Sequence, residues 1–237
     1  MALPTINTPT YGLIIPSTDE KIKYRPFLVK EEKILLIAME SGKQEDIIHA
    51  VKEIVGECTF NKLDLGLMPM FDIEYIFLNI RAKSIGEVSD LKLLCPDDKE
   101  TYASVELNLT EVEVHQDEGH TNKIELTDEM GIYMKYPTID SFAETGITDI
   151  TASNMLDVIG SCVAQIYDKK GEEIFEAKDQ TKKELNEFIE QLSSKQFKEI
   201  QKFFDTMPKL RHVVELENPK TKVKSKVLLQ GLNDFFE

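Results

Sequence analysis

The side chains best suited to chemistry in this sequence are two histidines and the acids between them. His115 and His120 lie five positions apart in the stretch HQDEGH, with Asp117 and Glu118 between them. Imidazole and carboxylate groups bind zinc and calcium, but this spacing matches no ligand geometry of either ion. A solvated acidic loop explains the same residues more simply. We therefore expect no metal site and no cofactor.

The three cysteines are also poor candidates for chemistry. Cys58, Cys95 and Cys162 are odd in number and widely separated, which excludes a disulfide framework and suits a reducing cytoplasm. Cys95 precedes Pro-Asp-Asp, where a zinc knuckle would need a second cysteine about three residues on. Acids beside a thiol raise its pKa and make it a poor ligand and nucleophile. We expect Cys58 and Cys162 to be small core residues.

Motifs of catalysis and nucleotide binding do not occur in the sequence. It contains no GxxxxGK(S/T), GxGxxG, GxSxG, HExxH or CxxC pattern. Acidic pairs such as Asp97-Asp98 arise by chance in a chain with 43 acids, and adjacent residues on a helix do not face each other. We therefore predict no catalytic residues, no cofactor-binding residues and no enzymatic activity.

The features most typical of partner binding lie near the C-terminal end. Residues 208–226 contain six bases and two acids, whereas residues 97–130 contain eleven acids and two bases. The sequence closes on a pair of phenylalanines, which must either dock on the core of the chain or insert into a partner. We predict a partner-binding surface formed by six residues: Lys220, Lys222, Lys224, Lys226, Phe235 and Phe236.

The first part of the chain is predicted to position these features with a hairpin and three helices. Residues 1–27 have the pattern of an extended arm followed by a β-hairpin around PSTDE. Residues 28–85 form a predicted helical unit, in which Gly42 ends the first helix and Pro69 begins the third. The expected buried faces are Ile34, Leu35 and Ala38, then Ile47, Ile48, Val51, Ile54 and Val55, then Ile73, Ile76, Phe77 and Ile80.

The remaining segments alternate between strands and helices. Residues 86–137 are predicted as an acidic β-rich unit, residues 138–207 as a helical unit, and residues 208–237 as a basic hairpin ending in Phe-Phe. In the helical unit, Thr181 and Glu184 fit a capping box. The expected helical faces are Met155, Ile159, Cys162, Val163 and Ile166, then Leu185, Phe188, Ile189 and Leu192, then Phe197, Ile200, Phe203 and Phe204.

The acidic and the basic hairpin resemble each other in plan. Each has a strand, a polar turn with proline, a second strand and a short apolar closing segment, so that Leu94 aligns with Leu216 and Leu107 with Leu229. A duplication and two unrelated hairpins both explain this similarity. Their opposite charge suggests that the hairpins pair, either within one chain or between protomers.

These patterns predict an α+β fold with helical bundles and two or three antiparallel hairpins or small sheets. The net charge of −15 argues against binding to nucleic acid or to an anionic membrane. No apolar run approaches the roughly 18 residues of a membrane helix, and MALPTINTPTYG lacks the features of a signal peptide. We expect the protein to be made and to fold in a cytoplasm.

Three stretches of the sequence are similar to one known family. They are YRPFLVKEEKILLIA at 24–38, FDIEYIFLNIRAKSIGE at 71–87 and GLNDFF at 231–236. They resemble the T4-like bacteriophage baseplate protein family, which includes the baseplate hub subunit and the hub assembly catalyst, and they are most similar to cyanophage members. The resemblance extends from about residue 11 to the end. Relatives with cysteine pairs in both hairpin turns imply a zinc-stabilised hairpin, but this chain has only Cys95 there, with Asn218-Pro219 in the other turn.

The resemblance implies a non-enzymatic phage tail assembly protein, either a chaperone-like factor or a subunit of the baseplate hub. It implies other hub proteins as partners, and the cytoplasm of the infected host or the tail baseplate as the location. Pairing of the two hairpins between protomers would make the protein a homo-oligomer. It supplies no catalytic residues. Other functions remain open: a permanent structural virion subunit, a hub-associated cell-wall hydrolase, and nucleic-acid binding through residues 208–226, which the net charge opposes.

Overall fold

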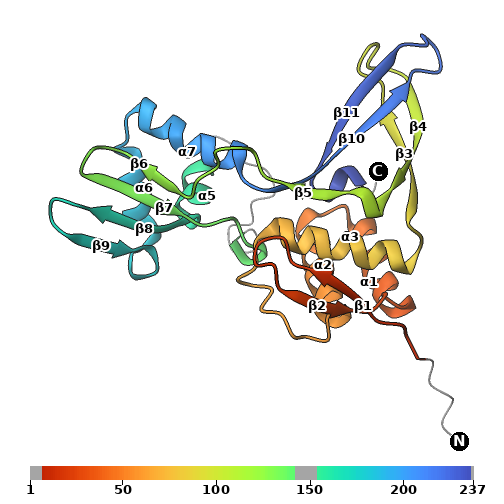
Figure 1. The fold of residues 1–237 in the computed structure, drawn as a ribbon, viewed down its shortest axis with the longest axis horizontal. Helices are drawn as coiled ribbons and strands as arrows, with labels where there is room; N and C mark the ends of the chain where they lie inside the picture. The colour runs from red at the N-terminus through yellow and green to blue at the C-terminus, as the bar shows by residue number, and fades with distance from the viewer. Residues whose placement is uncertain (1–6, 142–153, 236–237) are drawn as a thin grey trace, which may run out of the picture. The chain divides into compact units, whose positions relative to one another are not determined.

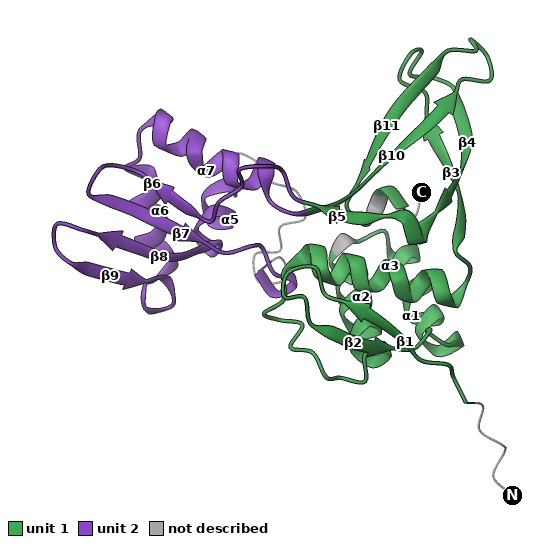
Figure 2. Ribbon diagram, viewed as in Figure 1, with its two compact units in different colours: residues 1–115, 209–237 green, residues 116–208 purple. Residues whose placement is uncertain are grey.

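The computed structural model describes residues 7–141 and 154–235, so most of the predicted N-terminal arm and Phe236 lie outside the described residues. The chain forms two compact units (Figure 2). Unit 1 comprises residues 1–115 and 209–237, and unit 2 comprises residues 116–208. Both combine helices with small antiparallel sheets, which confirms the predicted α+β class. The predicted acidic segment 86–137 is divided between the two units.

Unit 1 begins with the predicted hairpin and three helices (Figure 1). These elements are β1 (Tyr11–Ile14), β2 (Lys21–Tyr24), α1 (Val29–Ser41), α2 (Gln44–Cys58) and α3 (Met70–Ser84). Gly42 ends α1 in the left-handed conformation, with φ 66, and its N–H donates to the carbonyl of Met39. Pro69 is the N-cap of α3, where a missing N–H costs nothing. Gly42 therefore ends the first helix and Pro69 begins the third, as predicted.

Helix α3 is the centre of unit 1. Its predicted face of Ile73, Ile76, Phe77 and Ile80 is fully buried. Other sides of the helix are buried as well, because Leu78 and Ala82 pack against residues of two β-hairpins. A helix covered on several sides has no clean amphipathic pattern, which is why the sequence predicted only one of its buried faces.

Two further hairpins of unit 1 come from distant parts of the chain. The first is β3 (Val88–Leu94) with β4 (Tyr102–Asn108), and the second is β10 (Lys209–Glu217) with β11 (Lys224–Gln230). Strand β5 (Glu113–His115) pairs antiparallel with β10, which makes the sheet order β11-β10-β5. The inner faces of both hairpins share a core with α3, which consists mainly of Leu78, Leu91, Leu107, Leu109, Val112, Leu210, Val214 and Leu229.

Unit 2 has one four-stranded antiparallel sheet packed against helices. The strand order β6-β7-β8-β9 follows the chain. The elements are β6 (Lys123–Glu125), β7 (Met130–Met134), α5 (Met155–Ser161), β8 (Val163–Asp168), β9 (Glu173–Glu176), α6 (Lys182–Glu190) and α7 (Ser194–Thr206). The predicted apolar faces of α6 and α7 contribute Leu185, Ile189, Ile200 and Phe203 to its core. The phenylalanine stripe of α7 is therefore a packing face.

The prediction that one helix continues through Val163 and Ile166 is wrong. Helix α5 ends at Ser161, and Val163–Asp168 is strand β8, in which Ile166 pairs with Ile132 of β7. The segment VAQIYD is rich in β-branched and aromatic residues, and the neighbouring strands supply the partners that an isolated sequence window lacks. Strand β9 also lies in the segment that was predicted to be helical. The prediction that these residues lie on a common apolar face is nevertheless close, since Ile159, Cys162 and Val163 share one core.

Replacing Thr181 with alanine tests the predicted capping box at the start of α6. The Thr181 hydroxyl accepts the N–H of Glu184 at 3.2 Å, and the Glu184 carboxylate accepts the N–H of Thr181 at 2.8 Å. We expect Thr181→Ala to lower the free energy of unfolding by about 1 kcal/mol in urea denaturation. Thr181→Ser keeps the hydroxyl and is the control. Equal losses in the two variants would contradict the role of the cap.

Candidate protein-binding site

The predicted basic residues lie on a hairpin whose turn repeats the turn of the acidic hairpin. In the first turn the N–H of Lys99 donates to the carbonyl of Cys95 at 3.0 Å, and in the second the N–H of Lys222 donates to that of Asn218 at 2.9 Å. Both lysines have a left-handed backbone, with φ values of 54 and 65. A 3-10 turn follows each hairpin. The two hairpins thus share a local plan, as the sequence similarity predicted, while duplication as its origin stays a prediction.

The tips of the two hairpins are joined within the chain. The carboxylate of Asp97 accepts the side-chain amide of Asn218 at 3.0 and 3.1 Å and the hydroxyl of Thr221 at 2.5 Å. These hydrogen bonds lower the pKa of Asp97. Asn218 is fully buried, and Cys95 packs with Leu216 in a small apolar cluster. Of the two predicted modes of pairing, the structure therefore has the one within a single chain.

Opposite charge contributes little to this pairing of the hairpins. One ion pair connects the tips, between Lys220 and Glu100 at 3.9 Å, and both side chains are largely exposed. Exposed ion pairs are screened by solvent and salt, so their contribution to stability is small. Apolar burial and the hydrogen bonds of Asp97 therefore hold the hairpins together.

The outward side of the second hairpin presents an apolar centre beside lysines. Val213 and Leu228 face each other across the strands and are 53% and 52% exposed. Lys222 and Lys224 flank the exposed Val223 at the tip, and within the described residues neither lysine has an ion-pair partner. Glu215 and Glu217 are exposed on the same side, where Glu215 pairs with Lys226 at 3.1 Å and Glu217 lies across the strands from Lys224. We call this surface the basic face; it consists of Val213, Lys222, Val223, Lys224, Lys226 and Leu228.

Phe235 was predicted to dock on the core or to anchor a partner, and the structure places it in the core. Its side chain is 0% exposed and packs in the cluster that α3 shares with the hairpins. Gly231, in the left-handed conformation with φ 71, turns the chain after β11, and its N–H donates to the carbonyl of Leu210 at 3.1 Å. Phe235 is thus no exposed anchor, which corrects its assignment to the partner-binding surface. Phe236 lies outside the described residues.

A partly buried acid holds the turn that leads to Phe235. Glu74 of α3 accepts the backbone N–H of Leu232 at 3.3 Å. Burial raises the pKa of Glu74 to about 7, although this hydrogen bond favours the charged form. Sequence reasoning missed this residue because its partner lies 158 positions away in the chain. No local pattern signals such a contact.

His120, the second histidine of the HQDEGH stretch, stabilises the fold of unit 2. The ring nitrogens of His120 form hydrogen bonds with the hydroxyls of Thr206 at 2.9 Å and Tyr136 at 3.1 Å, and the ring packs against Phe203. Burial lowers the pKa of His120. His115 is an exposed residue of β5 in unit 1. In the two described ranges, 7–141 and 154–235, no three His, Cys, Asp or Glu side chains are grouped as metal ligands would be.

The three cysteines are buried and form no disulfide with one another. Burial raises the pKa of Cys58 and of Cys162 to about 11, so at neutral pH both are thiols in the core, as predicted. The pKa of Cys95 is raised as well, by burial first and then by Asp97 and Asp98. The predicted effect of the neighbouring acids on Cys95 is confirmed in direction.

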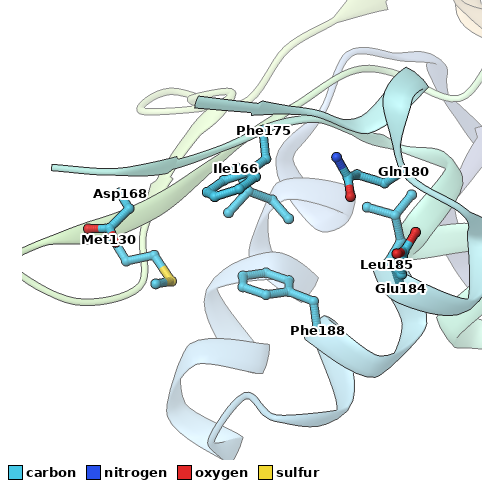
Figure 3. Close-up of a pocket in the computed structure, with 8 residues that line it drawn as sticks. All are labelled: Met130, Ile166, Asp168, Phe175, Gln180, Glu184, Leu185 and Phe188. Carbon is cyan, nitrogen blue, oxygen red and sulfur yellow. The ribbon is translucent and has the colours of Figure 1, made fainter. Parts of the chain in front are cut away.

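Unit 2 contains an apolar pocket of about 310 Å³ between α6 and its sheet. In Figure 3, Phe188 of α6 points toward Ile166 and Phe175 of the strands, with Glu184 at the side of the pocket. Glu184 is the capping residue of α6, and hydrogen bonds from Thr181 lower its pKa. A glycoside hydrolase needs a proton donor whose pKa is raised, so Glu184 has the opposite property.

The fold and these surfaces can be compared with known proteins. Residues 8–237 match the family model described as T4 bacteriophage base plate protein. The chain belongs to this family. A search among curated proteins and a search among solved structures each found no significant match. The predicted resemblance is thus confirmed at the level of the family.

Membership of the T4 bacteriophage base plate protein family gives the chain a structural or assembly role in the phage tail baseplate, in contact with other baseplate proteins. Within the described residues, no helix is both long enough and apolar enough to span a membrane.

Replacing Phe235 with alanine tests whether the end of the chain is part of the core. Removal of a fully buried ring loses its apolar contacts and leaves a cavity, so we expect a loss of about 3–5 kcal/mol in the free energy of unfolding. Leu228→Ala on the exposed side of the β10–β11 hairpin is the control, with an expected change within about 0.5 kcal/mol. Similar values for both variants in urea denaturation would refute the buried position of Phe235.

Replacing Glu74 with glutamine tests the raised pKa of this acid. Between its ordinary value of 4.5 and about 7, the folded protein holds the proton that the unfolded chain releases. The stability contributed by the neutral carboxyl is therefore full below pH 4.5 and is lost as the pH rises through about 7. We expect Glu74→Gln to raise the melting temperature, relative to the wild type, more at about pH 8 than at about pH 5.

Glu106→Gln, on the exposed face of β4, is the control for this pH dependence. It should shift the melting temperature equally at both pH values. A Glu74→Gln shift that is the same at the two pH values would contradict a pKa of Glu74 that lies between them.

Proposed function

We propose that this baseplate family member is a non-enzymatic assembly factor of the baseplate hub, which acts through protein–protein contacts in the cytoplasm of the infected host. The observation that carries the proposal is the basic face on the β10–β11 hairpin. Exposed apolar residues surrounded by charged ones are typical of protein interfaces. Lys222 and Lys224 suit an acidic patch on another baseplate protein, although the chain itself has a net charge of −15.

The roles of the reactive side chains support a non-enzymatic function. Both ring nitrogens of His120 form hydrogen bonds, Glu184 caps a helix, and the three cysteines are buried thiols. Each of these groups stabilises the fold. A catalytic nucleophile or acid would instead lie in a cleft, where a substrate can reach it.

The chaperone-like form of the proposal rests on the physics of the basic face. Lysines at an exposed tip accelerate encounter with an acidic partner more than they strengthen the final complex. Such an interface is suited to holding a hub protein and releasing it. A permanent subunit would use larger and more apolar contacts. Mass spectrometry of purified virions separates the two roles, because many copies in finished particles would exclude a transient factor.

Charge reversal on the basic face tests the proposed contact. The full chain is co-expressed with the other baseplate proteins of the same phage, captured through a tag, and the complex is measured. We expect the double variant Lys222→Glu/Lys224→Glu to weaken binding at least about tenfold, since two attractive contacts become repulsive. The double variant Lys195→Glu/Lys198→Glu carries the same charge change on α7 and should bind like the wild type. Equal binding by both variants would refute the basic face.

Two further assays address the competing functions. A hub-associated hydrolase would clear a suspension of peptidoglycan, and clearing by the pure protein would overturn the non-enzymatic proposal. Binding to nucleic acid through residues 208–226 would give a gel shift that persists at moderate salt. We expect no such shift, because the net charge repels phosphates.

A further inference from the structure

Helix α1 presents an apolar face to solvent. Val29, Leu36, Ile37 and Met39 are 80%, 54%, 57% and 48% exposed. Surface helices of this length normally turn their apolar stripe toward the core. An exposed cluster of this kind on a folded unit marks an interaction surface.

The opposite side of α1 is firmly anchored in unit 1. Ala38 is buried, and the buried carboxylate of Glu31 accepts a hydrogen bond from the guanidinium of Arg25 at 2.7 Å. This bond and the N–H of Leu28 bring the pKa of Glu31 down to about 2, although burial acts in the other direction. Turning the exposed apolar residues inward would take Glu31 away from Arg25 and leave that largely buried guanidinium without its partner.

Two exposed charges frame the apolar centre of this face. Lys33 and Glu40 lie seven residues apart, which is about two helical turns or roughly 10 Å, and therefore point the same way. Leu36 and Ile37 lie between them. Among the described residues neither Lys33 nor Glu40 has an ion-pair partner. Along the line through Lys33 and Glu40 the face thus runs positive, apolar, negative, while the exposed Glu32 lies to one side of this line.

We propose that this face binds the same face of a second copy of the chain, with the two α1 helices antiparallel. A two-fold axis between Leu36 and Ile37 places Leu36 of each copy against Ile37 of the other. The same axis places Lys33 of each copy opposite Glu40 of the other. An interface of this symmetry uses one patch twice, and every contact occurs in duplicate.

The order of charges favours a second copy over another occupant. The face is complementary to itself in the antiparallel orientation, whereas a parallel pair would bring like charges together. A foreign partner would require no such symmetry about Leu36 and Ile37. One helix per protomer buries less than the roughly 1,600 Å² of a standard interface, so we expect a reversible dimer with a dissociation constant on the order of micromolar. This contact is independent of the basic face on β10–β11.

A charge-swap series measured by sedimentation equilibrium of the full chain tests the dimer. The wild type should pass from monomer to dimer between about 1 and 300 µM. Lys33→Glu and Glu40→Lys should each weaken the dimer at least about tenfold, because the two-fold axis turns one substitution into two repulsive contacts. The double variant Lys33→Glu/Glu40→Lys restores opposite charges and should return to within about threefold of the wild type.

A second pair of variants tests the apolar centre. Leu36→Glu should also weaken the dimer, while Leu67→Glu, at a residue of unit 1 that is 78% exposed, should leave it unchanged. Circular dichroism confirms that the variants keep their helices. A chain that stays monomeric at about 300 µM overturns the proposal and leaves the face for a different protein. A dimer that does not respond to the charge swap overturns it too, because that dimer must form elsewhere.

Discussion

Unit 1 depends on the pairing of two strands that flank the whole of unit 2. Strand β10 pairs with β5 through Lys209–His115, Leu210–Val114 and Arg211–Glu113, and this pairing joins the last part of the chain to the first. Closing so long a loop costs conformational entropy, which the short ladder alone cannot offset. The apolar core that α3 shares with both hairpins and Phe235 supplies the remaining stabilising free energy. The end of the chain is therefore part of the core of unit 1.

This closure also explains where the candidate binding surfaces lie. The two hairpins bury their inner faces against each other and α3, so their polar sides and tips must face outward. Asp97 fixes one tip to the other through Asn218, which leaves the lysines of the second tip on a supported hairpin rather than on a mobile tail. A rigid support lowers the entropy that binding must overcome. Both this basic face and the face of α1 are consistent with a role in assembly.

Acidic residues in this protein have two separate uses. Together the 43 acids give the chain its net charge of −15, and three of them, Glu31, Asp97 and Glu74, also hold particular segments in place. The pKa of Glu31 and of Asp97 is lowered by their hydrogen bonds, and that of Glu74 is raised by burial. The difference follows from the partners: a guanidinium or several donors favour the carboxylate, while a single backbone N–H does not offset desolvation. The amino-acid composition shows the net charge, but it does not show which acids hold segments in place.

The sequence by itself determined the features that depend on neighbours a few residues away. Gly42 ends α1, Thr181 with Glu184 begins α6, and alternation along the β3–β4 and β10–β11 hairpins marks their buried faces. Tertiary structure decided the rest. Val163–Asp168 is a strand because β7 pairs with it, and Phe235 is buried because α3 and the hairpins form a pocket for it. The physical reason is that local preferences are worth under about 1 kcal/mol per residue, so contacts with distant segments outweigh them.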